Sequence, residues 1–204
     1  MVRVGHPCYN AVMIQGENLQ DADLLQALLG GAVGVLPTDT VYGLVCVAAH
    51  EAAVERLYQL KSRENKPGTI IAASLDQLVE LGMKRRYLAA VQQFWPGQVS
   101  VVVPTDNPKL GYLDQGKASL AVRVVDDAKL VKLLEKTGPL LTSSANQPGE
   151  PPANTIAEAQ AYFGNSVDFY IDGGERANLQ PSTLIRVVDD AIEVLRQGAV
   201  TIDA

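Results

Sequence analysis

The sequence predicts an α/β fold, because segments with helical patterning and segments with strand patterning alternate along the whole chain. The chain has 204 residues, which fits one domain of ordinary size, and we expect residues 1–204 to form a single domain. Hydrophobic residues make up 47% of the chain and charged residues 20%, a composition typical of globular rather than disordered proteins.

The helices are expected where apolar residues recur three or four positions apart, with a capping residue before them and glycine or proline after them. In the first such segment, Leu24 and Leu28 lie on one stripe and Gly30 ends the helix. In chain order, the expected helices cover residues 21–29, 51–60, a short segment capped by Ser74, 86–94, 127–136 and 155–163.

The strands are expected in short apolar runs rich in β-branched residues and ended by proline or turn residues. Residues 99–103 read Val-Ser-Val-Val-Val, and Pro104 ends the run. The expected strands cover residues 32–36, 69–73, 99–103, 120–125, a strand that starts at 140–141, 167–171, 183–188 and 192–195. Residues 147–154 hold three prolines and a glycine, which predicts a loop over a site rather than a domain boundary.

Charge and cysteine content exclude several classes of protein. Seventeen Lys and Arg against 23 Asp and Glu give a net charge of −6, which argues against a surface that binds nucleic acid throughout but allows a local basic pocket. Two cysteines make no disulfide framework and favour a reducing compartment. Without an apolar leader or a run of about 18 apolar residues, we expect a cytoplasmic protein with no membrane contact. Two histidines are too few for a His-rich metal site, and we expect no dedicated metal site.

Residues 111–117 match the spacing GxxxxGK of a phosphate-binding loop, but the context does not fit. The motif needs Ser or Thr next and then a helix, whereas Ala118 follows here and the next segment reads as a strand. We therefore interpret this segment as a surface turn.

Lys61 and Arg63 follow an expected helix. In an extended segment, side chains two positions apart point the same way, so both could converge on one anion such as a phosphate. The alternative is that these basic residues only balance the helix dipole.

Other polar candidates lie at strand ends or inside strands. Thr142, Ser144 and Asn146 follow an apolar strand, where open α/β sheets bind ligands, although an ordinary Ser/Asn turn explains them equally well. Thr38 also follows a strand and could simply shape a turn. Arg123 interrupts an apolar run, so it either meets an anion or lies on the solvated face of its strand.

Taken together, seven segments resemble the YrdC-like threonylcarbamoyl-AMP synthases in their single-domain form. The matching segments are LPTDTVYGL at 36–44, KSR at 61–63, FWPGQVSVVV at 94–103, SLAVRV at 119–124, TSSANQPGEPP at 142–152, QPSTLIR at 180–186 and LRQG at 195–198. The resemblance extends over residues 21–198, and its K-x-R and S-x-N pairs are more specific together than alone.

This resemblance implies a twisted mixed sheet with flanking helices around a large concave, locally positive cavity. It implies an enzyme, a nucleotidyltransferase that condenses L-threonine, bicarbonate and ATP to threonylcarbamoyl-AMP and pyrophosphate. Mg²⁺ is expected to accompany ATP, held by phosphates and water. The product would feed a separate transferase that modifies tRNA, and direct tRNA binding stays open.

The resemblance also implies roles for ten residues. It assigns Lys61 and Arg63 to catalysis at the triphosphate of ATP, where cations offset the repulsion between two anions. The other expected ATP contacts are Ser119, Thr142, Ser144, Asn146 and Arg196. The expected threonine contacts are Thr38, Arg123 and Ser182, with Arg123 on the carboxylate.

The chain departs from the family pattern at three places. Glu64 replaces a usual proline, Gly68-Thr69 stands where Pro-Leu or Gly-Leu is common, and Gln98-Val99 replaces Pro-Leu. A non-catalytic paralogue that binds a nucleotide or RNA therefore stays the alternative function. A second alternative is transfer of the carbamoyl group to another acceptor.

Overall fold

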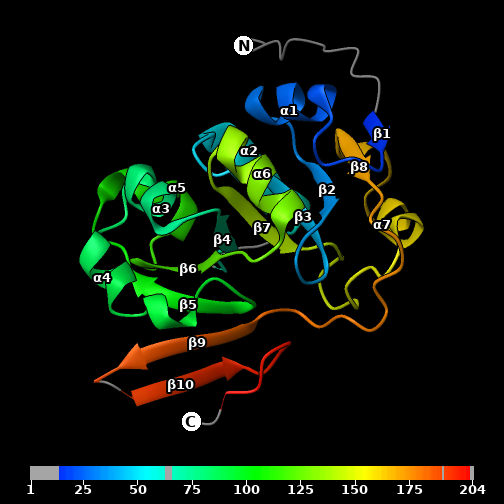
Figure 1. The fold of residues 1–204 in the computed structure, drawn as a ribbon. Helices are drawn as coiled ribbons and strands as arrows, with labels where there is room; N and C mark the ends of the chain where they lie inside the picture. The colour runs from blue at the N-terminus through cyan, green and yellow to red at the C-terminus, as the bar shows by residue number, and fades with distance from the viewer. Residues whose placement is uncertain (1–13, 63–65, 190, 203–204) are drawn as a thin grey trace.

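A computed structural model describes residues 14–62, 66–189 and 191–202. The described strands form one ten-stranded sheet in the order β1-β8-β2-β3-β7-β4-β6-β5-β9-β10 (Figure 1). The strands are β1 (Ile14–Gly16), β2 (Gly34–Pro37), β3 (Tyr42–Val47), β4 (Thr69–Ala72), β5 (Val99–Pro104), β6 (Ser119–Val124), β7 (Leu140–Ser144), β8 (Phe169–Ile171), β9 (Thr183–Val188) and β10 (Ala191–Arg196).

Helices flank this sheet. The α-helices are α1 (Ala22–Leu29), α2 (Glu51–Leu60), α3 (Leu75–Leu81), α4 (Arg85–Ala89), α5 (Gly111–Asp114), α6 (Ala128–Thr137) and α7 (Ile156–Phe163). Three short 3₁₀ helices are η1 (Gln92–Phe94), η2 (Pro108–Leu110) and η3 (Gly164–Ser166). Ser74, Asp127 and Thr155 cap α3, α6 and α7 by accepting hydrogen bonds from backbone N–H groups of the first turn, as the sequence predicts.

The sheet is mixed and twisted, as the resemblance implies. Strand β4 pairs with β6 in parallel and β5 with β9 in parallel, whereas β3 is antiparallel to both of its neighbours, β2 and β7. Helices on both faces bury two apolar clusters. Leu57 of α2 belongs to one cluster, and Leu28 of α1 and Leu134 of α6 belong to the other. Within the part of the chain that is described, no helix has the length and apolar character needed to cross a membrane.

Local structure differs from the expectation at four places. Strands β1 and β3 were not expected; turn-forming residues precede β3 and Gly43 lies within it, which weakens its strand signal although all six of its residues are buried. The single helix expected over residues 86–94 is α4 followed by a separate 3₁₀ turn, η1, because Val91 between them leaves the helical region at φ −125°. The phosphate-loop look-alike contains the short helix α5 rather than a turn, although strand β6 follows it as expected.

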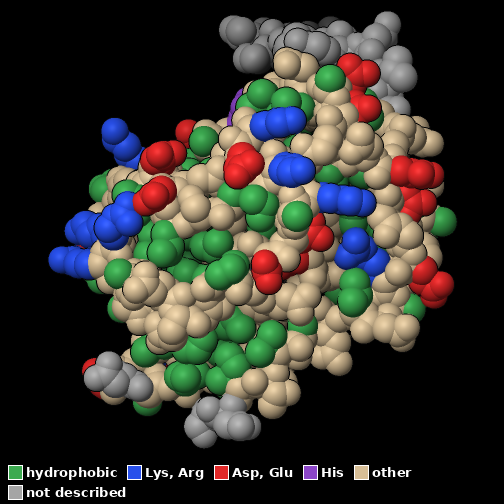
Figure 2. All heavy atoms as spheres, viewed as in Figure 1, with side chains coloured by type: hydrophobic (Ala, Val, Ile, Leu, Met, Phe, Trp, Pro, Cys, Tyr) green, Lys and Arg blue, Asp and Glu red, His purple; other side chains and the backbone are tan. Residues whose placement is uncertain are grey.

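The sheet topology gathers distant segments. The turn between β2 and β3 lies beside the end of β7, since Gly43 pairs with Ser144. A long connection runs from β8 to β9 (Figure 1), and it brings Ser182 next to Ser100 of β5. The surface of the view in Figure 2 carries acidic and basic side chains interspersed, with hydrophobic side chains gathered over β9 and β10.

Candidate active site in two adjoining cavities

A large cavity of about 780 Å³ lies where α2 meets the end of β7. It is lined by Tyr58, Gln59, Lys61, Ser62, Lys66, Ser144, Asn146, Pro148 and Gly149. Its volume falls in the range of cavities that hold small-molecule ligands and cofactors. The sequence-predicted residues Lys61, Ser144 and Asn146 therefore line one cavity.

Lys61 connects α2 to the end of β7. Its side chain is buried, and its ammonium donates hydrogen bonds to the carbonyl oxygen of Ser144 at 2.9 Å and to Asn146 Oδ1 at 2.8 Å. It also donates to the carbonyl oxygen of Asn146. A lysine with three donors thus holds the K-x-R and S-x-N segments together across 83 residues of sequence.

The backbone at Lys61 is not extended. The argument that the side chains of residues 61 and 63 point the same way assumed an extended segment, and that assumption is wrong. Lys61 caps the C-terminus of α2 with φ −87° and ψ −2°, and Ser62 adopts a positive φ of 45°. The chain therefore turns sharply after Lys61. Arg63 and Glu64 lie outside the described residues.

Ser144 and Asn146 form an ordered turn. Ser144 Oγ donates to Asn146 Oδ1 at 2.7 Å, and Asn146 Nδ2 donates to the carbonyl oxygen of Glu150 at 2.5 Å. The backbone of Ala153 returns to Ala145 through a 2.9 Å hydrogen bond. The proline-rich loop is thereby fixed against the large cavity, where Pro148 and Gly149 form part of the wall.

A smaller cavity of about 270 Å³ adjoins the first one, and Lys66 and Ser144 line both. Its wall contains Thr38, Arg123, Thr142, Ser182 and Arg196, all of which sequence analysis singled out. Thr142 and Arg196, which the resemblance assigns to ATP, line this smaller cavity rather than the larger one. Ser119 lines neither cavity, although it belongs to the same strand, β6, as Arg123.

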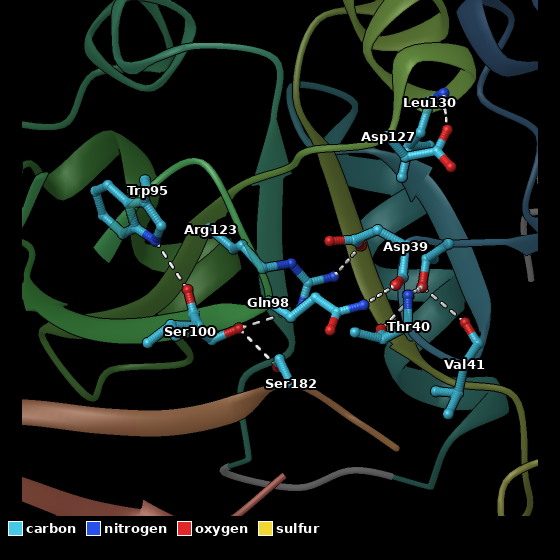
Figure 3. Close-up of polar contacts among 12 residues, drawn as sticks. Asp39, Thr40, Val41, Trp95, Gln98, Ser100, Arg123, Asp127, Leu130 and Ser182 are labelled. Atoms are coloured by element: carbon cyan, nitrogen blue, oxygen red, sulfur yellow. Dashed lines mark hydrogen bonds and ion pairs between the residues drawn. The ribbon is translucent and has the colours of Figure 1, made fainter. Parts of the chain in front are cut away.

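Arg123 forms a buried ion pair with Asp39, which sequence analysis did not single out. Arg123 Nη2 lies 2.7 Å from Asp39 Oδ1, and the two side chains are only 3% and 6% exposed (Figure 3). Burial raises the pKa of Asp39 and lowers that of Arg123, because each charged form loses hydration, while the partner's opposite charge opposes both shifts. Arg123 is therefore not on a solvated face, and its charge is balanced inside the protein.

A chain of hydroxyl groups continues from this pair (Figure 3). Arg123 Nη1 lies 3.4 Å from Ser100 Oγ, which lies 2.8 Å from Ser182 Oγ. Arg196 Nη2 donates to the carbonyl oxygen of Ser182 at 2.8 Å. Strands β6 and β10 and the connection before β9 thereby place Arg123, Arg196 and Ser182 in the wall of the smaller cavity, with Ser100 of β5 next to them.

The turn at residues 38–41 is shaped by its own hydroxyl groups, as the sequence allowed. Thr38 Oγ1 donates to the carbonyl oxygen of Val41 at 2.7 Å and accepts from the backbone N–H of Thr40 at 3.2 Å. Thr38 nevertheless lines the smaller cavity. Gly43 follows this turn, and a Cβ atom there would lie 2.5 Å from Thr142 Oγ1, so only glycine allows this close approach.

Sequence reasoning missed four polar residues around the two cavities. These are Asp39, Lys66, Gln98 and Arg176. For Asp39 two signals were available: its position inside the motif at 36–44, and the need of Arg123, a charge in an apolar strand, for a partner of opposite charge. Among the residues that the structure describes, no group of three or more His, Cys, Asp or Glu side chains could hold a metal ion.

Two adjoining polar cavities, lined from the β2–β3 turn, β6 and the end of β7, are typical of α/β proteins with small-molecule sites. Residues 26–198 match the model of the Sua5/YciO/YrdC family, which is described as telomere recombination. Since this match covers more than half of the chain, the chain belongs to the Sua5/YciO/YrdC family.

Two proteins of similar sequence are both named threonylcarbamoyl-AMP synthase. A threonylcarbamoyl-AMP synthase of Chromohalobacter salexigens is 40% identical over 168 residues, which cover 80% of this chain and 90% of that protein. A threonylcarbamoyl-AMP synthase of Marinobacter nauticus is 35% identical over 175 residues, which cover 83% of this chain and 92% of that protein.

Solved structures show the same fold. The crystal structure of P. abyssi Sua5 complexed with L-threonine matches with a TM-score of 0.77 and 28% identity, covering 91% of this chain and 57% of that one. The present chain thus spans little more than half the length of Sua5. The crystal structure of E. coli YciO is similar in fold, with a TM-score of 0.73 and 22% identity. The match covers 91% of the present chain and 93% of YciO.

Replacing Arg123 alone should destabilise the protein, because it leaves the buried carboxylate of Asp39 without its partner. We expect Arg123→Met to lower the free energy of unfolding by about 3–5 kcal/mol, and the double variant Arg123→Met, Asp39→Asn to recover most of this loss. Urea unfolding measures both. As a control, Arg186→Met removes an exposed pair with Glu193 and should change stability little. Equal losses in Arg123→Met and in the control would contradict this view of the buried pair.

Proposed function

We propose that this protein is a threonylcarbamoyl-AMP synthase, which condenses L-threonine, bicarbonate and ATP to threonylcarbamoyl-AMP and pyrophosphate. The observation that carries the proposal is the adjacency of two cavities of suitable size, one with Lys61 and one with Arg123, that share Ser144 and Lys66. The names of the relatives at 40% and 35% identity support it. The continuous sheet from β1 to β10 supports treating residues 1–204 as one domain.

The reaction needs two steps that require no enzyme nucleophile. The ammonium group of threonine and bicarbonate give a carbamate, one water and one proton. A carbamate oxygen then attacks the α-phosphorus of ATP, the bond from this phosphorus to the bridging oxygen breaks, and pyrophosphate leaves. Catalysis of this nucleotidyl transfer consists mainly of positioning the two anions and stabilising the charge between them.

The large cavity is the proposed ATP site. Lys61 supplies a cation at the triphosphate, and Ser144 and Asn146, which it holds in place, offer polar contacts beside it. Arg63 is the second proposed cation, on the basis of the family resemblance. ATP enters as its Mg²⁺ complex, with the ion bound to phosphate oxygens and water, since magnesium commonly keeps such ligands.

The smaller cavity is the proposed threonine site. Arg123 recognises the carboxylate of threonine, and Thr38 and Ser182 contact its polar groups, because all three line this cavity. Thr142 and Arg196 line the same cavity, so we place them where the carbamate meets the α-phosphate rather than at the adenosine. Ser119, the remaining ATP contact that the resemblance implies, stays a proposal without support from the cavity walls.

The product is an activated acyl phosphate that must pass to an acceptor. We propose that a separate cytoplasmic transferase uses it to modify tRNA, and that this chain does not itself need to bind tRNA. The mixed charge of the surface in Figure 2 agrees with this division of labour.

The first test is pyrophosphate release from ATP by the full chain. We expect release to require both threonine and bicarbonate, because the carbamate is the attacking group. A coupled phosphate assay with each component left out in turn measures this. Release that is indifferent to threonine would indicate another acceptor, and no release would favour a non-catalytic paralogue that binds a nucleotide or RNA.

The second test removes the cation of the large cavity. We expect Lys61→Ala to lower kcat/KM for ATP about 30- to 900-fold, which corresponds to roughly 2–4 kcal/mol of transition-state stabilisation. Lys109→Ala is the matched control, because Lys109 is exposed on η2 and lines neither cavity. Thermal unfolding of both variants separates loss of catalysis from loss of structure. A Lys61→Ala enzyme with the wild-type kcat/KM would show that the phosphates bind elsewhere.

A further inference from the structure

Asp39 is not in the wall of the smaller cavity but pairs with Arg123, which is. Its carboxylate is 6% exposed, and Oδ1 accepts the hydrogen bond from Arg123 Nη2 at 2.7 Å. Asp39 Oδ2 and Arg123 Nε have no hydrogen-bond partner among the described residues, although both atoms are buried. The ion pair is therefore held by one hydrogen bond, and Arg123, which lines the smaller cavity, also lies 3.4 Å from Ser100 Oγ through Nη1.

Side chains from other elements hold the backbone that carries Asp39. The carbonyl oxygens of Thr38 and Thr40 accept from Arg176 Nη1 at 2.6 and 3.2 Å. The carbonyl oxygen of Asp39 itself accepts a hydrogen bond from Gln98 Nε2 (Figure 3). Three consecutive carbonyl groups are thus fixed, so the carboxylate keeps its position relative to Arg123. A proline at position 98, which the family pattern favours, would offer no such donor.

The buried pair changes what the cavity attracts. Arg123 lines the cavity together with two other cations, Lys66 and Arg196, and Asp39 balances the charge of Arg123, so this carboxylate lowers the positive charge that a ligand meets there. A ligand with only a carboxylate meets attraction from Arg123 and repulsion from Asp39. An α-amino acid also carries an ammonium group one carbon away from its carboxylate, and the field of Asp39 favours that positive charge. In a poorly hydrated cavity such differences are large.

We propose that Asp39 is a specificity-determining positioning residue, which makes the smaller cavity selective for α-amino acid zwitterions over carboxylates that lack the ammonium group. This inference rests on the proposed function. Once the ammonium becomes a carbamate, the ligand carries two negative charges and no longer gains from the field of Asp39.

The test compares two ligands that differ only in the ammonium group. We would measure equilibrium binding of L-threonine and of 3-hydroxybutyrate, which is threonine without its amino group, by calorimetry on the full chain. The wild type should bind threonine at least about tenfold more tightly. Asp39→Asn should reduce this ratio at least about fivefold, by weakening threonine and strengthening 3-hydroxybutyrate.

A matched control exists on the same chain. Asp114 is another buried carboxylate, which accepts from Thr105 Oγ1 at 2.6 Å and from the backbone N–H of Gly116 at 2.8 Å, and it lines neither cavity. Asp114→Asn therefore also replaces a buried carboxylate, as Asp39→Asn does, and we expect a similar loss of stability. It should leave the ratio of the affinities for L-threonine and 3-hydroxybutyrate unchanged. A ratio that shifts equally in both variants would mean that the effect is only structural.

The outcomes separate this inference from the proposed function. If the wild type binds threonine and a folded Asp39→Asn protein keeps the wild-type ratio, the inference is wrong and the proposed function stands. If Asp39→Asn does not fold, the wild type still decides, because equal affinities for the two ligands would overturn the inference. If the wild type binds neither ligand, the proposed threonine site itself is wrong, and the inference is lost with it.

Discussion

The buried ion pair between Arg123 and Asp39 is the interaction on which the site depends. It joins β6 to the turn between β2 and β3, two segments separated in the sheet by β7 and β4. Removing two charges from water is costly, so the pair persists only because the surrounding structure holds both partners. Gln98 and Arg176 fix the turn, and Ser100 faces the guanidinium. With this pair in place, the smaller cavity has one wall with a balanced charge and a defined hydrogen-bonding pattern.

The two cavities differ in what holds them together. In the larger one, a lysine at the end of a helix organises the turn after β7, and the same lysine is the proposed partner of the triphosphate. In the smaller one, Arg123 is paired within the protein and is proposed to recognise the substrate without adding net charge, beside Lys66 and Arg196 in the same wall. Since Ser144 and Lys66 belong to both walls, ligands in the two cavities would meet at these residues. An attack of one ligand on the other requires this kind of proximity.

Much of this arrangement could be predicted from the sequence, and the failures have physical reasons. Caps such as Ser74 and Asp127 mark helices by local chemistry and were identified correctly. Strand β3 was missed because turn-forming residues precede it and Gly43 lies within it, which weakens the local strand signal. The grouping of Lys61 with Ser144 and Asn146 followed from family resemblance, whereas spacing alone left it open. The partner of Arg123 lies 84 residues away, and no local pattern connects the two.

The most direct test of two substrates in adjoining cavities is a crystal structure with L-threonine and an ATP analogue whose α,β-bridge cannot be cleaved. We expect the phosphates beside Lys61, Ser144 and Asn146, and the threonine carboxylate on Arg123, with its nitrogen directed towards the α-phosphate. A nucleotide bound away from Lys61, or a threonine that does not contact Arg123, would contradict this account of how the protein brings its substrates together.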